Sequence, residues 1–332
     1  MAGSYSPHPG LAQLSKADYD QRDTKHEVIV VKTVACIGLG TMGKPMALQV
    51  IGAGLSVNVY DLQPHATDQL AQAGAKGCDS PRDASNGVDI VLLSLPGPTE
   101  VVEAITGTDG VLQAETLPAV IVDLSTNSVE TVRELAAQCE TVGVGFVDAP
   151  VSGGVAKAQT GELSVMVGGD PQAVALAKPA LEAIGTDIFE VGPVGSGTIA
   201  KLVNNQLFLA GAVLVQESYA LAHGLGMDLT VLDEVVSASS GNFYNKLAPL
   251  LLGRRFDDVP FRLDIAAKDV AMAVEAAQSV NAPTPLTRQA ADIYRRATEA
   301  GDGHQAFHAT LKELEREANY ELPPLRRSRK KA

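Results

Sequence analysis

The first half of the chain alternates short apolar runs with longer stretches whose apolar positions recur at helical spacing. Seven runs of strand length follow one another between residues 33 and 191, and a helical stretch separates most of them. This alternation is typical of βαβ units in a mostly parallel sheet. It predicts an α/β fold with a Rossmann-like, doubly wound sheet. The predicted strands are Thr33–Ile37, Ser56–Tyr60, Asp89–Leu95, Val120–Val122, Gly145–Val147, Leu163–Val167 and Ile188–Val191, and the predicted helices are Gly43–Ala53, His65–Ala73, Thr99–Ile105, Ser128–Cys139 and Pro171–Ile184.

The strand pattern stops after about residue 197. The segment from Thr198 to His223 predicts one long, apolar-rich helix, and four shorter helical stretches follow it. The second half is therefore predicted to be an all-helical C-terminal domain, joined to the sheet by the long helix. The shorter predicted helices are Leu229–Ser237, Leu263–Ser279, Pro285–Glu299 and His304–Ala318.

Length and composition fit a globular chain of two domains. The chain has 332 residues, of which 45% are hydrophobic and 20% charged, and a domain takes about 150 residues. The net charge is −13, and five positive charges lie in the last seven residues, so the rest of the chain carries −18. Such a body repels a phosphate backbone, which argues against nucleic acid as a partner. The basic end is interpreted as a solubilising tail, with a localisation or anchoring signal as the alternative.

The placement of cysteine and histidine predicts no metal site. The three cysteines lie far apart, a usage that fits a reducing compartment. His304 and His308 have the i, i+4 spacing of a metal-binding helix, but Gln305 stands where that motif has glutamate. No apolar run reaches the ~18 residues that span a bilayer, and residues 1 to 30 match neither a signal peptide nor a transit peptide. A cytoplasmic protein with no membrane partner is expected.

A glycine motif follows the first predicted strand. Residues 38 to 43 read GLGTMG, which has the G-x-G-x-x-G spacing, and a predicted helix follows. Between a strand and a helix this motif lets the backbone approach a pyrophosphate, to which the helix N-terminus donates its amides. The alternative is a P-loop, but Pro45 follows Lys44 where a P-loop needs Ser or Thr to bind Mg²⁺. Dinucleotide binding is preferred, with Gly38, Leu39, Gly40, Thr41, Met42 and Gly43 as the cofactor-binding residues.

Asp61 ends the second predicted strand, 23 residues after Gly38. An acid at this place accepts hydrogen bonds from a ribose 2′-hydroxyl and repels a 2′-phosphate. No arginine stands among the next three residues. NAD is therefore expected as the cofactor in preference to NADP, and a plain turn acid is the alternative interpretation of Asp61.

Three further loops end predicted strands, at the edge where a doubly wound sheet binds its ligands. In the loop SLPGP, Leu95 and Pro96 are expected to wall the cofactor. In the loop DLSTN, Ser125 or Thr126 either caps the following helix or contacts ribose and nicotinamide. In the loop DAPVSGG, Ser152 and the glycine amides after it form either a donor site for a carboxylate or a flexible turn.

The long predicted helix opens with the segment GSGTIAKLVNN, residues 195 to 205. Lys201 and Asn205 are one turn apart and share a face of this helix. A nearby ammonium is disfavoured at a helix N-terminus, which lowers the pKa of such a lysine. A lysine of lowered pKa beside an orienting amide is a candidate for proton transfer. The alternative is a solvated surface lysine.

Together these motifs resemble the β-hydroxyacid dehydrogenase family, whose members include 3-hydroxyisobutyrate dehydrogenase and tartronate semialdehyde reductase. The resemblance covers residues 32 to 318. It rests on the glycine loop, on DAPVSGG continuing to GEL at residues 161 to 163, on the segment from Gly195 to Asn205, and on Lys268-Asp269. It implies a Rossmann-like domain, a helical domain built around the long helix, and homodimers or homotetramers formed through the helical domain.

The resemblance also implies roles for single residues. The family's catalytic lysine falls on Lys201, and its substrate-orienting asparagine falls on Asn205. The family's carboxylate-binding serine and glycines, and its second lysine near the nicotinamide or the substrate carboxylate, fall on Ser152, Gly153, Gly154 and Lys268. The pattern along the chain and the resemblance together predict a dinucleotide-binding domain (31–196) and a helical substrate and oligomerisation domain (197–320). The composition predicts an extension without stable order (1–30) and a basic tail (321–332), which both lie outside the family pattern.

The expected activity is reversible hydride transfer between a nicotinamide cofactor and a small 3-hydroxy acid of the 3-hydroxyisobutyrate type, with Lys201 as general acid and base. Residues 240 to 245 (SGNFYN) lie where the resemblance places the contacts that select the substrate. This segment is not typical of the enzymes for the named substrates, and it favours a polar sugar acid such as L-threonate as the alternative. Reduction of tartronate semialdehyde or of another semialdehyde is a second alternative. A dinucleotide-binding module without chemistry is less favoured because Lys201 is present, and a 6-phosphogluconate-type enzyme is disfavoured by the short helical half.

Overall fold

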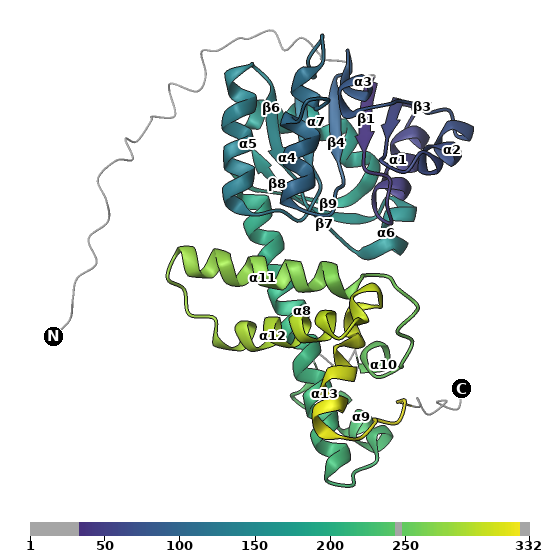
Figure 1. Cartoon of the computed structure of the whole chain (residues 1–332), viewed down its shortest axis with the longest axis vertical. Coiled ribbons are helices and arrows are strands. Elements are labelled where there is room, and N and C mark those ends of the chain that lie inside the picture. Colours follow the sequence, from purple (N-terminus) through teal and green to yellow (C-terminus); the bar gives the residue numbers. More distant parts are fainter. Residues whose placement is uncertain (1–32, 243–247, 326–332) are drawn as a thin grey trace, which may run out of the picture. The chain divides into compact units, whose positions relative to one another are not determined.

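The computed structural model describes residues 33–242 and 248–325, whose helices and strands appear in Figure 1. Within the described residues nine strands form one sheet, in the order β3-β2-β1-β4-β5-β6-β8-β7, with β9 paired to β8. Neighbouring strands from β3 to β6 are parallel, whereas β8 runs antiparallel to β6 and β7. The strands are β1 (Thr33–Ile37), β2 (Ser56–Tyr60), β3 (Lys76–Gly77), β4 (Ile90–Leu93), β5 (Val120–Asp123), β6 (Gly145–Asp148), β7 (Val151–Ser152), β8 (Leu163–Gly169) and β9 (Gly185–Gly192).

The strand order confirms the predicted doubly wound, mostly parallel sheet. Strand β1 has β2 on one side and β4 on the other, so the winding reverses at β1 and leaves a crevice beyond the carboxyl ends of β1 and β4. All seven predicted strands are present, with ends that differ by a few residues. The strands β3 and β7 have two residues each, too few to produce an apolar run, and the sequence does not predict them.

Helices cover both faces of the sheet (Figure 1). Along β1, Val34 and Cys36 face one side and Ala35 and Ile37 the other, as the two-residue period of a strand requires, and all four are buried. The first pair packs in a core with α1, α6 and α7, and the second in a core with α3, α4 and α5. The helices are α1 (Gly43–Gly52), α2 (His65–Gln72), α3 (Pro81–Ser85), α4 (Pro98–Thr106), α5 (Val129–Thr141), α6 (Gly154–Thr160) and α7 (Pro171–Ile184).

After β9 the described chain is helical, as predicted. The long helix α8 contacts the sheet through β8 and the other helices through α11, α12 and α13. Its residues Leu209, Val213 and Tyr219 form a separate core with Tyr294 and Phe307. The helices are α8 (Ser196–Gly224), α9 (Leu229–Ser237), α10 (Ala248–Leu251), α11 (Leu263–Ser279), α12 (Pro285–Glu299) and α13 (Thr310–Ala318).

The predicted helix from His304 to Ala318 is wrong in its first six residues. The structure has two 3₁₀ turns there, Asp302–His304 and Phe307–Ala309, and α13 begins at Thr310. Between the turns the backbone is extended, because the N–H groups of Ala306 and Phe307 donate to the carbonyls of Phe256 and Phe261. These tertiary hydrogen bonds replace the local bonds of a helix, so His304 and His308 do not share a helical face.

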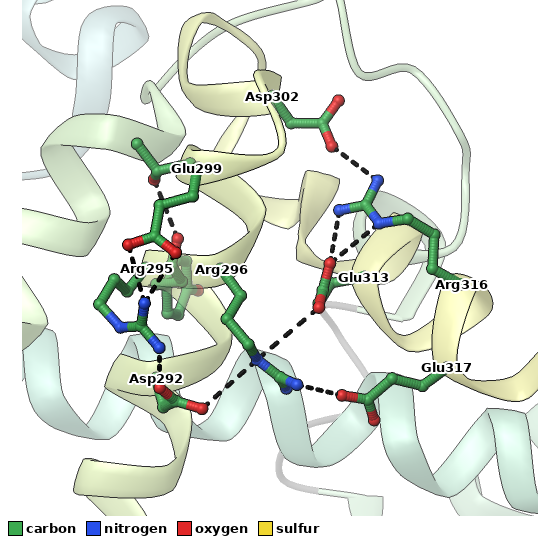
Figure 2. Close-up of polar contacts among 10 residues, drawn as sticks. Asp292, Arg295, Arg296, Glu299, Asp302, Glu313, Arg316 and Glu317 are labelled. Carbon is green, nitrogen blue, oxygen red and sulfur yellow. Dashed lines mark hydrogen bonds and ion pairs between the residues drawn. The ribbon is translucent and has the colours of Figure 1, made fainter.

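Ion pairs connect α12 with α13 (Figure 2). Arg296 contacts Asp292 on its own helix and Glu313 and Glu317 on α13. Arg316 on α13 pairs with Asp302 and Glu313. Most of these side chains are partly exposed, so each pair contributes little by itself, and the network mainly fixes how α13 lies on α12.

Helix α8 meets the length and hydropathy criteria for a bilayer span, with a mean hydropathy of 1.4 over its best 18 residues. The expectation that no segment is long and apolar enough is therefore wrong by these two criteria. A core helix of a globular protein meets the same criteria, and 44% of this window is buried within the protein. Polar residues such as Lys201, Asn205 and Gln216 also lie on this helix, and the last two are buried.

His308 makes the stability of the helical region depend on pH. Its ring is buried between Phe256 and Phe307, and burial lowers its pKa from 6.5 to about 4. Between pH 6.5 and pH 4, His308 is therefore protonated in the unfolded chain and neutral in the folded chain. The contribution of His308 to the free energy of unfolding has its full value above pH 6.5. It falls by up to about 3 kcal/mol as the pH drops to 4.

This expectation is checked by urea unfolding at several pH values between 7.5 and 4. We expect His308→Gln to have a shallower fall in unfolding free energy with acid than the wild type. His304→Gln is the matched control, because His304 is exposed and its loss should leave the slope unchanged. An unchanged slope in His308→Gln would show that other groups cause the acid sensitivity.

Candidate functional site

The glycine loop joins β1 to α1 beside β4. Gly38 has a φ of +87°, and its N–H donates to the Tyr60 carbonyl at 2.9 Å. A Cβ on Gly43 would lie 1.9 Å from the Gly38 carbonyl oxygen, so only glycine lets α1 approach the loop. A Cβ on Gly40 would meet no atom within 4 Å, and this open, exposed position is where a pyrophosphate can approach the backbone.

The start of α1 suits an anion. Its first turn has no acidic residue, and Met42 at the N-cap offers no side-chain hydrogen bond to the helix amides. Lys44 N and Met46 N donate to the carbonyls of Gly40 and Met42, and Pro45 has no N–H. Gly43 N and the positive end of the helix dipole are therefore what this turn offers a phosphate. Leu39 is buried beneath the loop, whereas Thr41 is exposed on it. The residues present therefore fit the dinucleotide that the sequence predicts.

The Asp61 carboxylate lies against the glycine loop. One oxygen accepts a hydrogen bond from Leu39 N at 2.7 Å, and the other accepts one from Gln63 N at 2.8 Å. The carboxylate is thus held at the carboxyl end of β2, beside the loop that follows β1. A ribose attached to a pyrophosphate on the loop would reach this carboxylate.

The loops after β4 and β5 are joined at the same edge of the sheet. Leu95 N donates to Ser125 Oγ at 3.0 Å, and Pro96 is exposed. The capping alternative for Ser125 and Thr126 is wrong, because Ser128 caps α5 by accepting from Thr131 N at 3.0 Å. Ser125 instead connects the two loops, which leaves Thr126 partly exposed at their edge.

The loop after β6 holds the start of α8. The Asp148 carboxylate is buried and accepts from Gly195 N at 2.8 Å and from Thr198 N at 2.7 Å. Burial raises its pKa to about 6, against the lowering effect of these two donors. Asp148 therefore fixes the first turn of the helix that carries Lys201. The sequence signal for this role is an acid at a strand end, but nothing in the sequence shows which helix it caps.

Lys201 extends from α8 towards the same loop. Its Nζ donates to the Val151 carbonyl at 2.7 Å. Burial lowers the pKa of Lys201, the charge of Asp269 opposes this shift, and the charge of Lys268 adds to it. Ser152 follows Val151 and is partly buried, so Lys201 lies at the loop that was predicted to bind a carboxylate.

Gly153 and Gly154 turn the chain from β7 into α6. Both have positive φ angles, +132° and +69°, and both are exposed. A Cβ on Gly153 would lie 2.6 Å from Lys157 Cδ. These conformations place the two N–H groups at a helix start next to Ser152, which is the geometry of an anion-binding turn.

Asn205 and Lys268 meet at Asp269, on α11. Asn205 Nδ2 donates to Asp269 Oδ2 at 2.8 Å, and Lys268 Nζ lies 2.8 Å from Asp269 Oδ1. Lys268 Nζ also donates to the Thr126 carbonyl at 3.0 Å, so it reaches the loop after β5. Asp269 is 1% exposed. It was not among the predicted site residues, although its place directly after Lys268 in a family motif was a signal.

The predicted catalytic residues and the second lysine therefore gather in one place, at the carboxyl ends of β5 and β6 and beside the cofactor loops. The segment that was predicted to contact the substrate, residues 240 to 245, is not placed at this site by the described residues. Residues 240 to 242 lie exposed in a turn after α9. Phe243, Tyr244 and Asn245 lie outside the described residues.

Models of two protein families match the chain. Residues 33–192 match the NAD binding domain of 6-phosphogluconate dehydrogenase. Residues 195–314 match a family described as NAD-binding of NADP-dependent 3-hydroxyisobutyrate dehydrogenase. The two matches meet at the start of α8.

Curated relatives match over nearly their whole length. An NAD-dependent L-serine dehydrogenase from Pseudomonas aeruginosa is 36% identical over 290 residues, covering 85% of this chain and 97% of that protein. A 3-hydroxyisobutyrate dehydrogenase from the same organism is 37% identical over 284 residues, covering 82% and 95%. The solved structure of Mycobacterium tuberculosis 3-hydroxyisobutyrate dehydrogenase with L-serine is similar, with a TM-score of 0.77, 33% identity, and coverage of 86% of this chain and 99% of that one.

Proposed function

Because this chain belongs to the β-hydroxyacid dehydrogenase family and is a nicotinamide-dependent 3-hydroxyacid dehydrogenase, we propose that Lys201 is its general acid and base. We propose further that its substrate is a 3-hydroxypropanoate with one small group on C2. Both 3-hydroxyisobutyrate and L-serine have this form, and relatives of the chain are named for them. The observation that carries the proposal is the partly buried Lys201 ammonium, held at Val151 beside the Asp269 charge.

In the proposed mechanism the alcohol loses two hydrogens to different acceptors. A bound nicotinamide supplies the acceptor for the hydride that leaves C3. Lys201, when neutral, takes the proton of the C3 hydroxyl, and the product is an aldehyde. In the reverse direction the protonated Lys201 returns the proton to the developing alkoxide. A lysine suits both steps because burial brings its pKa closer to neutral pH.

The substrate carboxylate is proposed to bind between two groups of donors. Ser152, with the N–H groups of Gly153 and Gly154, lies on one side, and the Lys268 ammonium lies on the other. Fixing the carboxylate in this way determines which carbon is presented for hydride transfer. An alcohol without the carboxylate, or a hydroxy acid whose carboxylate lies one carbon farther from the hydroxyl, is expected to be a poor substrate.

NAD is proposed as the preferred cofactor, although one matching family is described for NADP-dependent enzymes. The support is the Asp61 carboxylate, held beside the glycine loop by Leu39 N and Gln63 N. A 2′-phosphate near this carboxylate would place two like charges together, which costs several kcal/mol unless a cation intervenes.

The proposal is tested by a rate screen of the purified protein. The substrates are 3-hydroxyisobutyrate, L-serine, glycerate, threonate and 3-hydroxypropionate, each with NAD and with NADP. We expect the highest kcat/KM with 3-hydroxyisobutyrate or L-serine, and a preference for NAD of roughly tenfold or more. A highest value with threonate would favour the sugar-acid alternative. The corresponding semialdehydes are assayed in parallel with NADH and NADPH, and their faster reduction would identify a reductase. No turnover of any acid would contradict the proposed function.

A homo-oligomer is proposed from an apolar stripe on α8. Ile199, Val203, Leu207, Leu214 and Leu221 recur at intervals of four or seven residues, and each is at least 44% exposed. With about 100° between successive residues, this stripe lies on the face opposite Lys201. Exposed apolar side chains in a continuous stripe are typical of a protein–protein interface.

Replacing both Leu207 and Leu214 with glutamate is expected to dissociate this oligomer. An unpaired carboxylate buried at an interface costs about 3 kcal/mol, which raises the dissociation constant roughly 100-fold. Light scattering after size exclusion measures the mass of the particle. Val142→Glu is the control, because Val142 is 49% exposed at the end of α5. A mass equal to a single chain in the wild type would contradict the proposal.

A further inference from the structure

Asp269 contacts the proposed site residues without itself being placed to touch the reacting atoms. It lies on α11, its side chain is 2% exposed, and its two oxygens contact different partners. Oδ2 accepts from Asn205 Nδ2, and Oδ1 is paired with the Lys268 ammonium. One carboxylate therefore connects a side chain of α8 with the lysine that reaches the loop after β5.

The Asp269 carboxylate determines which end of the Asn205 amide faces it. An ionised carboxylate only accepts hydrogen bonds, so the NH₂ group must point at Asp269. The amide oxygen of Asn205 in turn accepts from Asn204 Nδ2 at 3.3 Å. With both ends held, the second N–H of Asn205 meets no acceptor within residues 33–242 and 248–325 and can donate to another group. A hydroxyl, alkoxide or carbonyl oxygen of the substrate can use this donor.

Charge balance gives Asp269 a second effect. Among the described residues, the charged groups that act on Lys201 are Asp269 and Lys268, both from α11. From the loop after β6, Lys201 meets the Val151 carbonyl. Asp269 raises the pKa of Lys201, and Lys268 lowers it. Without Asp269, the two ammonium groups would lose the carboxylate that acts on both of them, and Asp123, which interacts with Lys268 only, would remain among the described acids.

We propose that Asp269 is a positioning residue of this dehydrogenase: it holds the Asn205 amide and the Lys268 ammonium, and so keeps one Asn205 N–H available to the reacting oxygen of the substrate. This inference rests on the proposed function, because it assigns Asp269 a place in the same reaction. The inference goes beyond the proposed function by naming a residue that acts through Asn205 and Lys268.

The first test is Asp269→Asn, assayed with the best substrate of the rate screen. An amide at this position accepts as well as donates, so Asn205 is free to turn. We expect kcat to fall roughly 10- to 100-fold, since small misplacements of catalytic groups cost this much. We also expect the pH profile of kcat/KM in the oxidation direction to move to lower pH, because Lys201 loses the charge that favours its protonated form. Asp264→Asn is the matched control on α11, where Asp264 pairs with Arg262.

A double-mutant cycle with Asn205→Ala tests whether Asp269 acts through Asn205. We expect Asn205→Ala to lower kcat by about 100-fold, the loss typical for one donor to a reacting oxygen. In that background Asp269→Asn should cost much less than in the wild type. Fully additive losses, or an unchanged kcat and pH profile in Asp269→Asn, would overturn the inference.

The tests remain decisive if Asp269→Asn fails to fold. Asn205→Ala keeps the carboxylate, and a full kcat in this variant would overturn the inference by itself. The proposed function is tested separately by turnover of the wild type. An active wild type with unaffected variants would refute only the role of Asp269, whereas an inactive wild type would refute the proposed function.

Discussion

Replacing Lys201 with alanine is expected to lower kcat by roughly 10²- to 10⁴-fold, the range that a general acid or base contributes. The loss should appear in both reaction directions, because the same group takes and returns the proton. Affinity for NAD should stay near its wild-type value, since Lys201 contacts the loop after β6 and not the glycine loop. The measurements are steady-state kinetics in both directions and calorimetric titration with NAD.

Two comparisons separate a catalytic role from a structural one. Lys178→Ala is the control, because Lys178 is an exposed helix lysine that pairs with Glu182 on α7, and its kcat should be unchanged. In the wild type, the rate of oxidation should rise with pH through the lowered pKa of Lys201, and the rate of reduction should fall through the same pKa. A Lys201→Ala variant with near-normal turnover would refute the assignment of the general base.

The sheet could be predicted well because its strands are buried. A strand such as β4, with all four residues buried, leaves an apolar run that no surface segment produces. The same argument explains the elements that the sequence did not predict or predicted wrongly. A two-residue strand such as β7 has too few positions to form a pattern. The segment from His304 to Ala309 has the composition of a helix, but its backbone donates hydrogen bonds to the carbonyls of Phe256 and Phe261, which are more than forty residues away.

The candidate site could be predicted from residues whose chemistry is local. The glycine loop, Asp61, Lys201 and Asn205 each belong to a short motif next to a strand or helix end. Asp148 and Asp269 could not be assigned in this way. Their hydrogen-bond donors at the start of α8 lie 47 to 64 residues away in sequence, and a buried carboxylate is recognised only when its donors are known. The residues that hold a site together are therefore harder to predict than those that act in it.

A single methyl group on Gly43 is expected to destabilise the sheet region strongly. The Cβ of Gly43→Ala would lie 1.9 Å from the Gly38 carbonyl oxygen and 3.2 Å from Ser94 Cβ. The first contact is with backbone, so α1 or the loop must move, and we expect a loss of about 3 kcal/mol in the free energy of unfolding. Because the displaced loop is the proposed pyrophosphate site, the dissociation constant for NAD should rise roughly tenfold or more.

Gly52→Ala is the matched control on the same helix. A Cβ at Gly52 would meet no atom within 4 Å, and alanine in a helix is more stable than glycine by about 0.5–1 kcal/mol. Urea unfolding should therefore move in opposite directions for the two variants, and only Gly43→Ala should lose NAD affinity. If Gly43→Ala bound NAD like the wild type, the close approach of α1 to the loop would not be what shapes the cofactor site. The Gly38 turn and the open Gly40 position would then have to define it without the position of α1.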